Sequence, residues 1–398
     1  MFFTFLWPSK DGDGGSQRAA FLLQSLARIG AVDLVYLTRR KDRKLEDLVP
    51  LTTEVASVSI VKIGTEPISD RRSWIPWSIG RWVDYARFGS KEYPRFSRSN
   101  LRRIARQLPR NKTDLVFAGR LPSAALVDAL LSSGYLHAKR RVVDFDDVMS
   151  KVIKQKARLD SRARIDARVY AALEAAAIGV AEDRATRTWD AVSVCTDEDV
   201  QTWPNRRVIK LPNVIERPLL PSSPGDGRHY LFVGSFTHGP NLIGLMRFLD
   251  EAWPSLRSRL PELSLTVVGM SPPAELKQRL ANLSIPLYSN VPSVQPFYEQ
   301  CDAVIAPITY GGGTRIKILE ALAYGRPLIA TRFAAEGLSL RNRRDALLVD
   351  GVRDFPDAMI GLAEDPALRS SLASNGRKHQ QEFFSPETLA QAVRTMVL

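Results

Sequence analysis

The residues with the clearest chemistry form a glycine run and the charged helical segment that follows it: Gly311, Gly312, Gly313, Thr314, Arg315, Lys317 and Glu320. The segment before the run, 303–308, is short and apolar, which is typical of a buried parallel strand. Glycines let the main chain approach a ligand closely, and the first N–H groups of a helix have no partner within the helix. The pattern therefore predicts a cradle for a diphosphate, with Arg315 and Lys317 adding positive charge.

Glu320 is the carboxylate of this segment. It lies six residues beyond Thr314, which is roughly 9 Å along a helix that rises 1.5 Å per residue. That distance suits the ribose hydroxyls of a nucleotide whose diphosphate sits at the helix start. The competing interpretation is a tight turn before a solvated helix, in which Glu320 pairs with Lys317 at i,i+3 spacing.

A second glycine loop near the start of the chain contains Gly14, Gly15 and Arg18, between a strand at 2–6 and a helix expected at 19–26. It is not a dinucleotide fingerprint, because a GxGxxG pattern would require a glycine where glutamine stands at position 17. We expect a flexible rim whose glycines and Arg18 contact the transferred group or the acceptor. An ordinary surface loop is the alternative.

Three aspartates lie at or just beyond the end of the strand expected at 141–145, namely Asp144, Asp146 and Asp147. Carboxylates at the carboxyl edge of a sheet can take a proton from an attacking hydroxyl, so Asp144 and Asp147 are candidate catalytic groups. N-capping of the next helix by Asp147 is the competing interpretation. The pair Asp144 and Asp146 also resembles a metal-binding pair, but that function would leave the later glycine cradle unexplained, and we predict no metal site.

Length and composition indicate a two-domain protein. The chain has 398 residues, of which 44% are hydrophobic, enough to bury two cores. Its two cysteines, Cys195 and Cys301, are far apart and lie in apolar segments, so they indicate neither a disulfide framework nor a metal site. No segment resembles a signal peptide or a spanning helix. These features predict a cytoplasmic protein.

The net charge of +13 is concentrated in the first half, since residues 1–210 carry +12 and residues 211–398 carry +1. The densest part interleaves cations with aromatic residues, which are Arg71, Arg72, Arg81, Arg87, Lys91, Arg95, Arg98, Arg102, Arg103, Arg106 and Arg110 with Trp74, Trp77, Trp82, Tyr85, Phe88, Tyr93 and Phe96. This mixture favours an anionic inner-membrane surface as a peripheral partner. Single-stranded nucleic acid and a plain solvated face are the alternatives, and we prefer them less.

Short β-rich runs alternate with helical patterns in both halves, which predicts an α/β fold with two parallel sheets. The expected strands are 2–6, 32–38, 55–63, 114–118, 141–145 and 191–195, followed by 230–233, 263–268, 303–308, 327–330 and 346–349. A proline-rich segment separates the halves. We therefore expect a domain at 1–214, a linker at 215–228, a second domain at 229–384 and a C-terminal helix at 385–398 that packs on the first domain.

The stretch from about 231 to 348 resembles the donor domain of bacterial family-4 glycosyltransferases of the retaining, group 1 type. The matching pieces, in order, are Phe232-Val233-Gly234-Ser235, Pro240-Asn241, Val267-Val268-Gly269, Ala306-Pro307, Gly311–Gly325 and Glu336-Gly337-Leu338. The glycine run is similar to a GxGTRxKxLEA subgroup. The resemblance implies a GT-B fold, in which two Rossmann-like, doubly wound domains face each other across a cleft.

The resemblance also implies roles for single residues. The glutamate that matches Glu320 holds the nucleotide ribose, and the turn before it contacts phosphate and sugar, while Gly234 and Ser235 belong to the donor site. A second glutamate of the broader family pattern is replaced here by Gly312. The first half resembles the family more loosely, through its glycine loop and its aspartate-rich strand end.

Together these observations predict a metal-independent, retaining glycosyltransferase with no cofactor beyond its nucleotide-diphosphate sugar. The expected acceptor is a hydroxyl of a lipid-linked sugar or saccharide, in exopolysaccharide or lipopolysaccharide assembly, reached by a cytoplasmic enzyme bound peripherally to the inner membrane. One alternative is a nucleotide-sugar epimerase on the same scaffold. The other is a non-catalytic protein that binds a nucleotide-sugar or nucleic acid.

Overall fold

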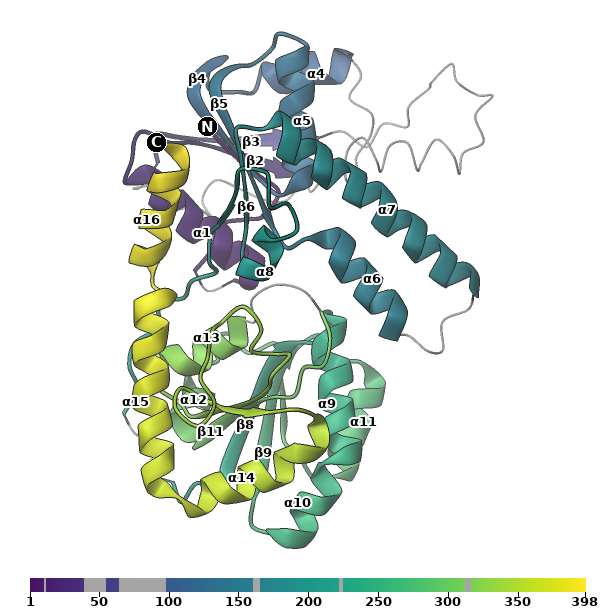
Figure 1. The fold of residues 1–398 in the computed structure, drawn as a ribbon, viewed down its shortest axis with the longest axis vertical. Helices are drawn as coiled ribbons and strands as arrows, with labels where there is room; N and C mark the ends of the chain where they lie inside the picture. The colour runs from purple at the N-terminus through teal and green to yellow at the C-terminus, as the bar shows by residue number, and fades with distance from the viewer. Residues whose placement is uncertain (11, 39–54, 64–97, 160–164, 222–224, 312–315) are drawn as a thin grey trace. The chain divides into compact units, whose positions relative to one another are not determined.

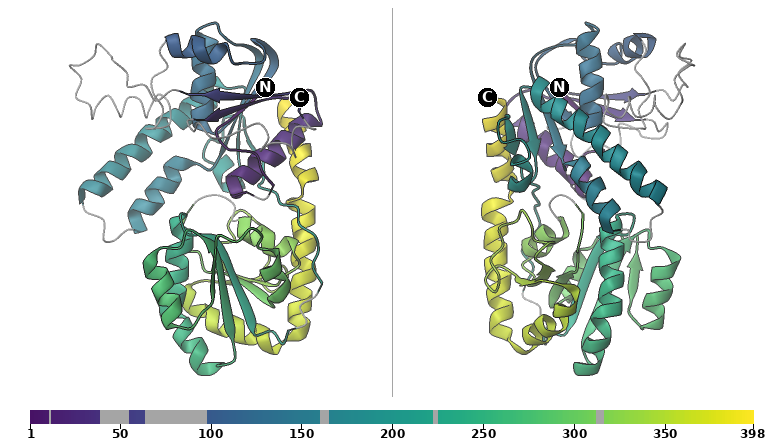
Figure 2. Two further views of the ribbon diagram at one scale, coloured as in Figure 1. Left: turned by 180° about the vertical axis from the view of Figure 1, so that it is seen from behind. Right: turned by 45° about the vertical axis from the view of Figure 1, so that its right-hand side comes forward.

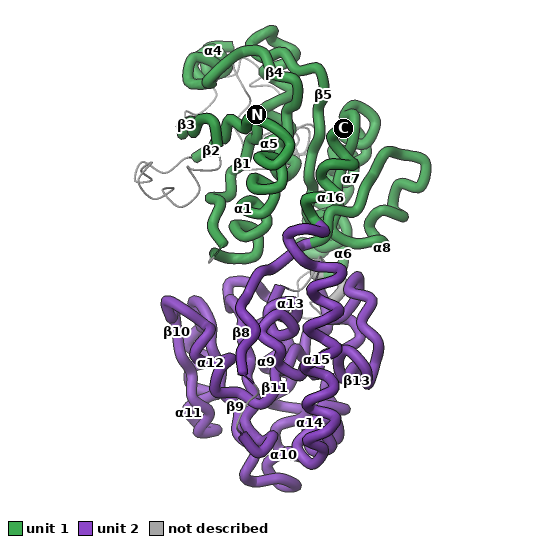
Figure 3. The backbone as a smooth tube through the Cα atoms, turned by 90° about the vertical axis from the view of Figure 1, so that its left-hand side faces the viewer, with its two compact units in different colours: residues 1–212, 389–398 green, residues 213–388 purple. Residues whose placement is uncertain are grey.

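The structure, a computed structural model, describes residues 1–398 except 11, 39–54, 64–97, 160–164, 222–224 and 312–315 (Figure 1). The described chain divides into two compact units, one made of Met1–Pro212 and Leu389–Leu398 and the other of Asn213–Thr388 (Figure 3). Each unit contains its own parallel sheet with helices on it. The predicted α/β fold with two parallel-sheet domains is confirmed.

Unit 1, which holds the N-terminus, is built on a seven-stranded sheet with the order β3-β2-β1-β4-β5-β6-β7. All its pairings are parallel. The strands are β1 Phe2–Thr4, β2 Asp33–Thr38, β3 Ser57–Lys62, β4 Lys112–Gly119, β5 His137–Asp146, β6 Ala191–Val194 and β7 Val208–Lys210. The order runs outward in one direction from β1 and in the other from β4, so these two strands flank the point of reversal.

The helices of unit 1 are α1 Gly14–Ala27, α4 Arg98–Ala105, α5 Leu121–Ser132, α6 Met149–Leu159, α7 Ile165–Thr188 and α8 Asp197–Val200. The apolar core against the sheet includes Phe3, Val116, Leu126 and Val143, while α6 and α7 pack on each other through Ile153, Ala177 and Ile178. Helix α1 begins five residues before the start expected from the sequence, because the Asp13 carboxylate accepts the Ser16 N–H at 2.8 Å and caps the helix. Gly14 and Gly15 therefore form its first turn.

Unit 2 is built on a six-stranded parallel sheet with the order β10-β9-β8-β11-β12-β13. Its strands are β8 His229–Ser235, β9 Ser264–Met270, β10 Leu287–Ser289, β11 Ala303–Ala306, β12 Leu328–Thr331 and β13 Leu347–Val349. Here the order reverses between β8 and β11. The sheet is buried on both sides, since one apolar cluster contains Phe232 and Phe248 and another contains Leu231 and Leu319.

Helices cover both faces of the unit 2 sheet, as Figure 2 shows from two sides. They are α9 Gly239–Glu251, α10 Trp253–Arg259, α11 Ala274–Asn282, α12 Gln295–Gln300, α13 Ile316–Ala323, α14 Phe355–Glu364 and α15 Pro366–Phe383. Because the central strands β11 and β12 lie between two helical layers, their residues are all buried and almost all apolar rather than alternating with polar ones.

The last helix, α16 Pro386–Val397, ends within unit 1. Its side chains Leu389, Val393 and Met396 are buried. The Arg140 guanidinium on β5 donates to the carbonyl oxygens of Val397 at 2.7 Å and Met396 at 3.0 Å. These contacts attach the end of the chain to the sheet of the N-terminal unit.

The basic aromatic stretch predicted as a membrane-binding surface lies mostly at 64–97, outside the described residues. Its described part includes α4, where Leu101 and Ile104 are buried and Arg102 and Arg103 are exposed. Across the described ranges, no helix is both long and apolar enough to cross a membrane.

Gly244 offers a test of how tightly α9 packs on the sheet. A Cβ at this position would lie 2.4 Å from the carbonyl oxygen of Pro307, which is a main-chain atom at the end of β11. Gly244→Ala should therefore destabilise the protein by about 1–3 kcal/mol, measured by urea denaturation.

Gly361 in α14 is the matched control, because a Cβ there would meet nothing within 4 Å. Gly361→Ala should raise the free energy of unfolding by about 0.5–1 kcal/mol, through helix propensity. Equal gains in the two variants would contradict the packing of α9 described here.

Candidate functional site

The order of the strands places a candidate binding site at one edge of the unit 2 sheet. In open parallel sheets, ligands bind beyond the carboxyl ends of the strands where the order reverses. In unit 2 this is the edge where β8 and β11 end. The segments that follow these strands lead into α9 and α13, so the starts of both helices belong to this edge.

Lys317, in the first turn of α13, contacts the end of β8 directly. Its ammonium donates to the Asn241 side-chain oxygen at 2.7 Å and lies 4.3 Å from the centre of the Phe232 ring. The Asn241 amide in turn donates to the Ser235 carbonyl at 2.8 Å. A Cβ at Gly234 would lie 2.8 Å from the ammonium, so the glycine leaves the room that this lysine occupies. Lys317 thus lies beside Gly234 and is connected to Ser235 through Asn241, while the donor-site roles that the resemblance implied for Gly234 and Ser235 stay predictions.

The glycine cradle is described only in part. Gly311 has φ of 120°, a conformation that side chains rarely adopt, and α13 begins at Ile316. Gly312, Gly313, Thr314 and Arg315 lie outside the described residues. Their contacts with a diphosphate stay a prediction.

Glu320 is buried on α13, and each of its carboxylate oxygens accepts from a protein donor. Arg217 reaches Oε1 through two nitrogens, Nε and Nη2, each at 3.2 Å, and the Tyr298 hydroxyl donates to Oε2 at 3.3 Å. Burial raises the pKa of Glu320, while Arg217, Tyr298 and Lys317 act to lower that pKa. Burial and the nearby Glu320 carboxylate also raise the pKa of the Tyr298 phenol, which stays protonated and able to donate.

Sequence reasoning missed both Arg217 and Tyr298. Arg217 belongs to the segment predicted as a linker, 103 residues before Glu320, and Tyr298 lies 22 residues before it. No local pattern marks either residue. A charged residue in a proline-rich linker was the available signal for Arg217.

In unit 1, Arg18 and Asp144 form a buried ion pair. The guanidinium donates to Oδ2 through Nε at 2.8 Å and to Oδ1 through Nη2 at 2.6 Å, and it also donates to the Leu211 carbonyl at 3.0 Å. Ser193 donates to the same Oδ1 at 2.7 Å. Burial alone lowers the pKa of Arg18, but the carboxylates of Asp144 and Asp146 outweigh it and raise that pKa. The donors of Arg18 and the oxygens of Asp144 are thus both occupied.

This pairing bears on two predicted roles. The sequence analysis assigned Arg18 to ligand contact and Asp144 to proton transfer. In the structure their side chains are each 3% exposed and satisfy each other. The geometry therefore makes the pair a support for the carboxyl edge of the unit 1 sheet, while the ligand contacts assigned to these residues stay predictions.

A second ion pair, between Arg120 and Asp146, lies beside the first. The Arg120 guanidinium donates to Asp146 Oδ2 at 2.8 Å, and the other oxygen of Asp146 is 3.5 Å from Arg18 Nε. Both Arg120 and Asp146 have positive φ, 69° and 66°, which is unusual for these residue types. A side chain at Gly15 would come within 3.0 Å of the Arg120 guanidinium. Arg120 thus joins the glycine turn of α1 to the aspartate-rich end of β5.

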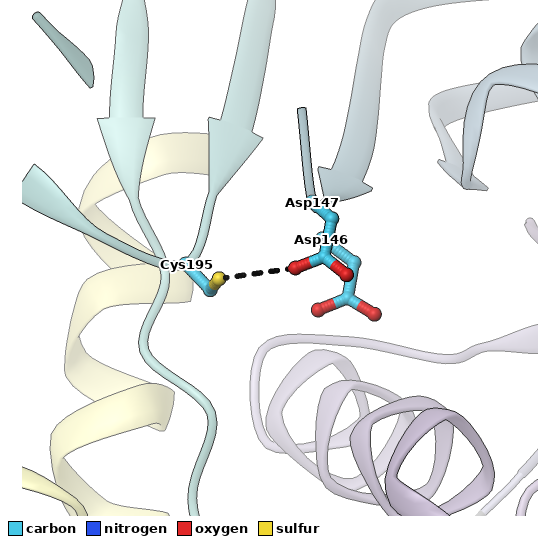
Figure 4. A group of neighbouring side chains, drawn as sticks. All are labelled: Asp146, Asp147 and Cys195. Carbon is cyan, nitrogen blue, oxygen red and sulfur yellow. Dashed lines mark hydrogen bonds between the residues drawn. The ribbon is translucent and has the colours of Figure 1, made fainter. Parts of the chain in front are cut away.

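Asp147 and Cys195 complete this cluster, and Figure 4 shows them with Asp146. The Cys195 thiol donates to Asp147 Oδ1 at 3.7 Å, and the potential ligand atoms of the three residues lie within 4.8 Å of one another. Two arginines already compensate the charge of Asp146. A divalent cation bound here would therefore experience less negative charge than the carboxylates of Asp146 and Asp147 alone would provide. That no metal takes part in the function stays a prediction.

A cavity of about 710 Å³ in unit 1 lies at the opposite edge of the sheet, where β2, β4 and β5 begin. Its lining includes Asp33, Lys112, His137 and Arg140. None of the site residues predicted from the sequence lines it, so the cavity and the candidate site are separate.

Comparison with known proteins finds a family match within unit 2. Residues 227–365 match the family described as "Glycosyl transferases group 1". A D-inositol 3-phosphate glycosyltransferase from Arthrobacter sp. is 29% identical over 184 residues, which cover 42% of this chain and 42% of that protein. A phosphatidyl-myo-inositol mannosyltransferase from Mycolicibacterium smegmatis is 25% identical over 198 residues, covering 47% and 50%. The chain thus spans half or less of these curated relatives.

Solved structures match over nearly the whole chain. Sucrose-phosphate synthase from Thermosynechococcus elongatus has a TM-score of 0.65 at 17% identity, covering 99% of this chain and 97% of that one. An S. aureus TarM mutant in complex with fondaparinux, alpha-GlcNAc-glycerol and UDP has a TM-score of 0.67 at 9% identity, covering 100% and 99%. Anabaena HepE in complex with UDP-glucose has a TM-score of 0.58 at 16% identity, covering 99% and 98%. These likenesses confirm the predicted GT-B fold.

The Arg18 ion pair predicts a large stability effect in unit 1. Asp144→Asn should destabilise the protein by about 3–5 kcal/mol, because it leaves a buried guanidinium without its charged partner. Urea denaturation followed by tryptophan fluorescence measures this loss.

The control is Asp114→Asn, which removes a carboxylate paired with Lys139 on the surface. This variant should unfold like the wild type, since exposed ion pairs contribute little. If Asp144→Asn were equally neutral, the ion pair would not hold this edge of the sheet.

Proposed function

We propose that this chain is a glycosyltransferase that moves a sugar from a nucleotide-diphosphate sugar to an acceptor hydroxyl, with the donor bound by unit 2. The observation that carries the proposal is the buried, charge-compensated Glu320 on the helix that follows the glycine run. It lies where the strand order reverses, within the residues that match the group 1 family. The names of the curated relatives support transfer as the type of reaction.

The donor half of the reaction is assigned to residues at this edge. The Glu320 carboxylate accepts the ribose hydroxyls, and the start of α13 with Lys317 binds the diphosphate. Negative charge grows on the departing diphosphate in the transition state, so an ammonium held there accelerates the reaction rather than only binding the donor. Arg315 and the N–H groups of Gly313 and Thr314 would share this role.

The acceptor half is assigned to unit 1, with Asp147 as the carboxylate that orients the attacking hydroxyl. Asp147 is less buried than Asp144, whose oxygens are engaged by Arg18 and Ser193. In a retaining reaction with attack on the same face, the leaving phosphate itself accepts the acceptor proton. Asp147 then needs to orient the hydroxyl but not to deprotonate it.

A lipid-linked sugar or another saccharide at an anionic inner-membrane surface is the acceptor we propose, in exopolysaccharide or lipopolysaccharide assembly. The charge of +12 on residues 1–210 supports such a surface. Exposed cations on and after α4, Arg102, Arg103 and Arg106, agree with it. The relative named for phosphatidyl-myo-inositol acts, by its name, on a lipid.

Two other functions are separable by product analysis. An epimerase would release free nucleotide and need no acceptor, whereas a binding protein would retain the nucleotide without turnover. The curated relatives described above are named as transferases, which favours transfer over both.

Nucleotide binding should depend on Glu320. A nucleoside diphosphate at 100 times its Kd stabilises a protein by about 2.7 kcal/mol, so one member of a UDP, GDP and ADP panel should raise the Tm of the wild type. Glu320→Gln should lose most of this increase, because an amide offers one acceptor oxygen in place of two.

Glu275→Gln on the exposed side of α11 is the control and should respond like the wild type. An equal increase in Tm for Glu320→Gln would remove Glu320 from the donor site. No increase with any nucleotide in the wild type would overturn the proposed function.

Lys317 should act mainly on kcat. Lys317→Met should lower kcat by about 10²–10³, the loss typical of removing one group that stabilises transition-state charge. Steady-state kinetics with the nucleotide-sugar identified above measure the effect.

Lys277→Met, an exposed lysine of α11, is the matched control with unchanged kcat. A rise in KM at constant kcat for Lys317→Met would mean that the lysine binds the ground state and transition state equally.

A further inference from the structure

The segment that enters unit 2, residues 213–221, is fastened to that unit by its main chain, and we call it the entry strap. The Gln380 amide donates to the Ile215 carbonyl at 2.9 Å, and Arg377 donates to the Arg217 carbonyl at 3.1 Å. Arg326 donates to the Pro221 carbonyl at 2.7 Å. These donors come from α15 and from the turn after α13, so the strap has a defined position beside α13.

The same arginines hold the surroundings of Glu320. Arg326 also donates to the Tyr298 carbonyl at 2.6 Å, and Arg377 also donates to the Ala323 carbonyl at the end of α13. The main chain of the strap, the Tyr298 segment and the helix that carries Glu320 are thus connected through two guanidinium groups. A side chain on the strap can therefore reach Glu320 in a reproducible geometry.

Arg217 is the strap side chain that does so. Its Nε and Nη2 both approach Oε1 of Glu320 at 3.2 Å, while Tyr298 takes Oε2. The side chains of Arg217 and Glu320 are 12% and 9% exposed, so water screens the pair little. A carboxylate oxygen has more than one lone pair, so an oxygen that accepts from protein donors can still accept from a ligand hydroxyl.

Recognition of a ribose places two demands on this carboxylate. It must be ionised, because a protonated carboxyl presents one oxygen as a donor instead of an acceptor. It must also point in one direction, because the two ribose hydroxyls are fixed relative to each other. Burial opposes the first demand, and a flexible glutamate side chain opposes the second.

We propose that Arg217 is a positioning residue of the donor site, which holds Glu320 ionised and oriented toward the ribose and so makes the site selective for ribonucleotides over deoxyribonucleotides. This inference rests on the proposed function. It assigns to the strap a part in substrate selection, which neither the family match at 227–365 nor the glycine motif includes.

The charged groups around Glu320 predict how nucleotide binding depends on pH. In the described part of the chain, the charged and titratable groups that face it are Arg217 from the strap, Tyr298 from α12 and Lys317 from its own helix. Cys301 and Tyr324 face Tyr298. Removing Arg217 takes away the largest influence that lowers the pKa of Glu320, so the carboxyl should take up a proton at a higher pH than in the wild type.

The experiment compares the Kd values of the nucleoside diphosphate that binds the wild type and of its 2′-deoxy and 3′-deoxy analogues. Isothermal titration across a pH series gives these values for the wild type, Arg217→Gln, Arg217→Lys and Glu320→Gln. In the wild type we expect the ribonucleotide to bind about 10-fold or more tightly than either analogue, the effect of a hydrogen bond to a charged group. Arg217→Gln should lose most of this preference, as Glu320→Gln does.

Three further results are expected if Arg217 positions Glu320. As the pH is lowered, the affinity of Arg217→Gln for the ribonucleotide should begin to fall at a higher pH than the affinity of the wild type does, because Glu320 takes up its proton earlier. Arg217→Lys should recover part of the preference, because it restores the charge but not the planar pair of donors. Affinity for inorganic pyrophosphate should be unchanged in all variants, which shows that the diphosphate part of the site is intact.

Arg228→Gln is the control, since it removes an exposed arginine whose salt bridges to Asp226 and Glu262 lie on the surface. It should bind like the wild type. If Arg217→Gln keeps the ribonucleotide preference and pH profile while Glu320→Gln loses the preference, the inference is overturned and the proposed function stands. If Arg217→Gln does not fold, the test rests on Arg217→Lys. If Arg217→Lys then shows the same ribonucleotide preference and the same dependence of Kd on pH as the wild type, the inference is overturned. If the wild type binds no nucleotide, the proposed function fails and the inference with it.

Discussion

The structure of unit 2 around Glu320 depends on one electrostatic constraint, which is that a buried carboxylate needs a charged partner. Removing an ionised carboxylate from water costs several kcal/mol, and good geometry with a cation is needed to offset that cost. For Glu320 the cation is Arg217, from a segment that precedes the whole sheet of unit 2. Its position depends in turn on Arg326 and Arg377, which hold main-chain carbonyls of the strap. The surroundings of Glu320 thus depend on Arg217 and Arg377, which are far from it in sequence, and on Arg326, which follows the motif directly.

Unit 1 meets the same constraint with different residues. Asp144 and Asp146 end a strand at the carboxyl edge, where such groups serve either chemistry or structure. Arg18 and Arg120 compensate both, and the positive φ of Arg120 and Asp146 belongs to the bend that brings them together. Strained backbone of this kind is often stored at functional sites. The chemistry proposed for the edge accordingly falls to the neighbouring Asp147, which is less buried.

The two kinds of similarity to known proteins differ in which unit they cover. The family match lies within unit 2, while the fold similarity extends over nearly all of the chain. A donor site recognises parts that nucleotide-sugars share, namely diphosphate and ribose, so its motif can be read across relatives. An acceptor site recognises what differs between substrates. The family match does not extend to unit 1, the half of the chain with the greater positive charge, to which we assign the acceptor.

Periodicity and turn residues were enough to predict the α/β alternation and the helix that carries Glu320, because these follow from patterns between residues close in sequence. The alternation of strands and helices in turn indicated parallel sheets, which the structure confirms. The glycine cradle stays a prediction, because residues 312–315 lie outside the described part of the chain. Two edge strands, β7 and β10, were missed because each is short and mostly only partly buried, so neither has the apolar run that marked the equally short β1 and β13. The early start of α1 was missed because a glycine pair suggests a loop, while the Asp13 cap favours a helix.

The partners of each buried charge could not be predicted. Arg217 and Tyr298 meet Glu320, and Ser193 meets Asp144, across separations of 22 to 103 residues. Electrostatic attraction depends on distance in space, and folding alone brought these groups within reach. The chain's local patterns thus specify which elements form and which motif they carry. The packed fold decides which charged side chains remain available to a ligand and which form ion pairs that stabilise the edges of the sheets.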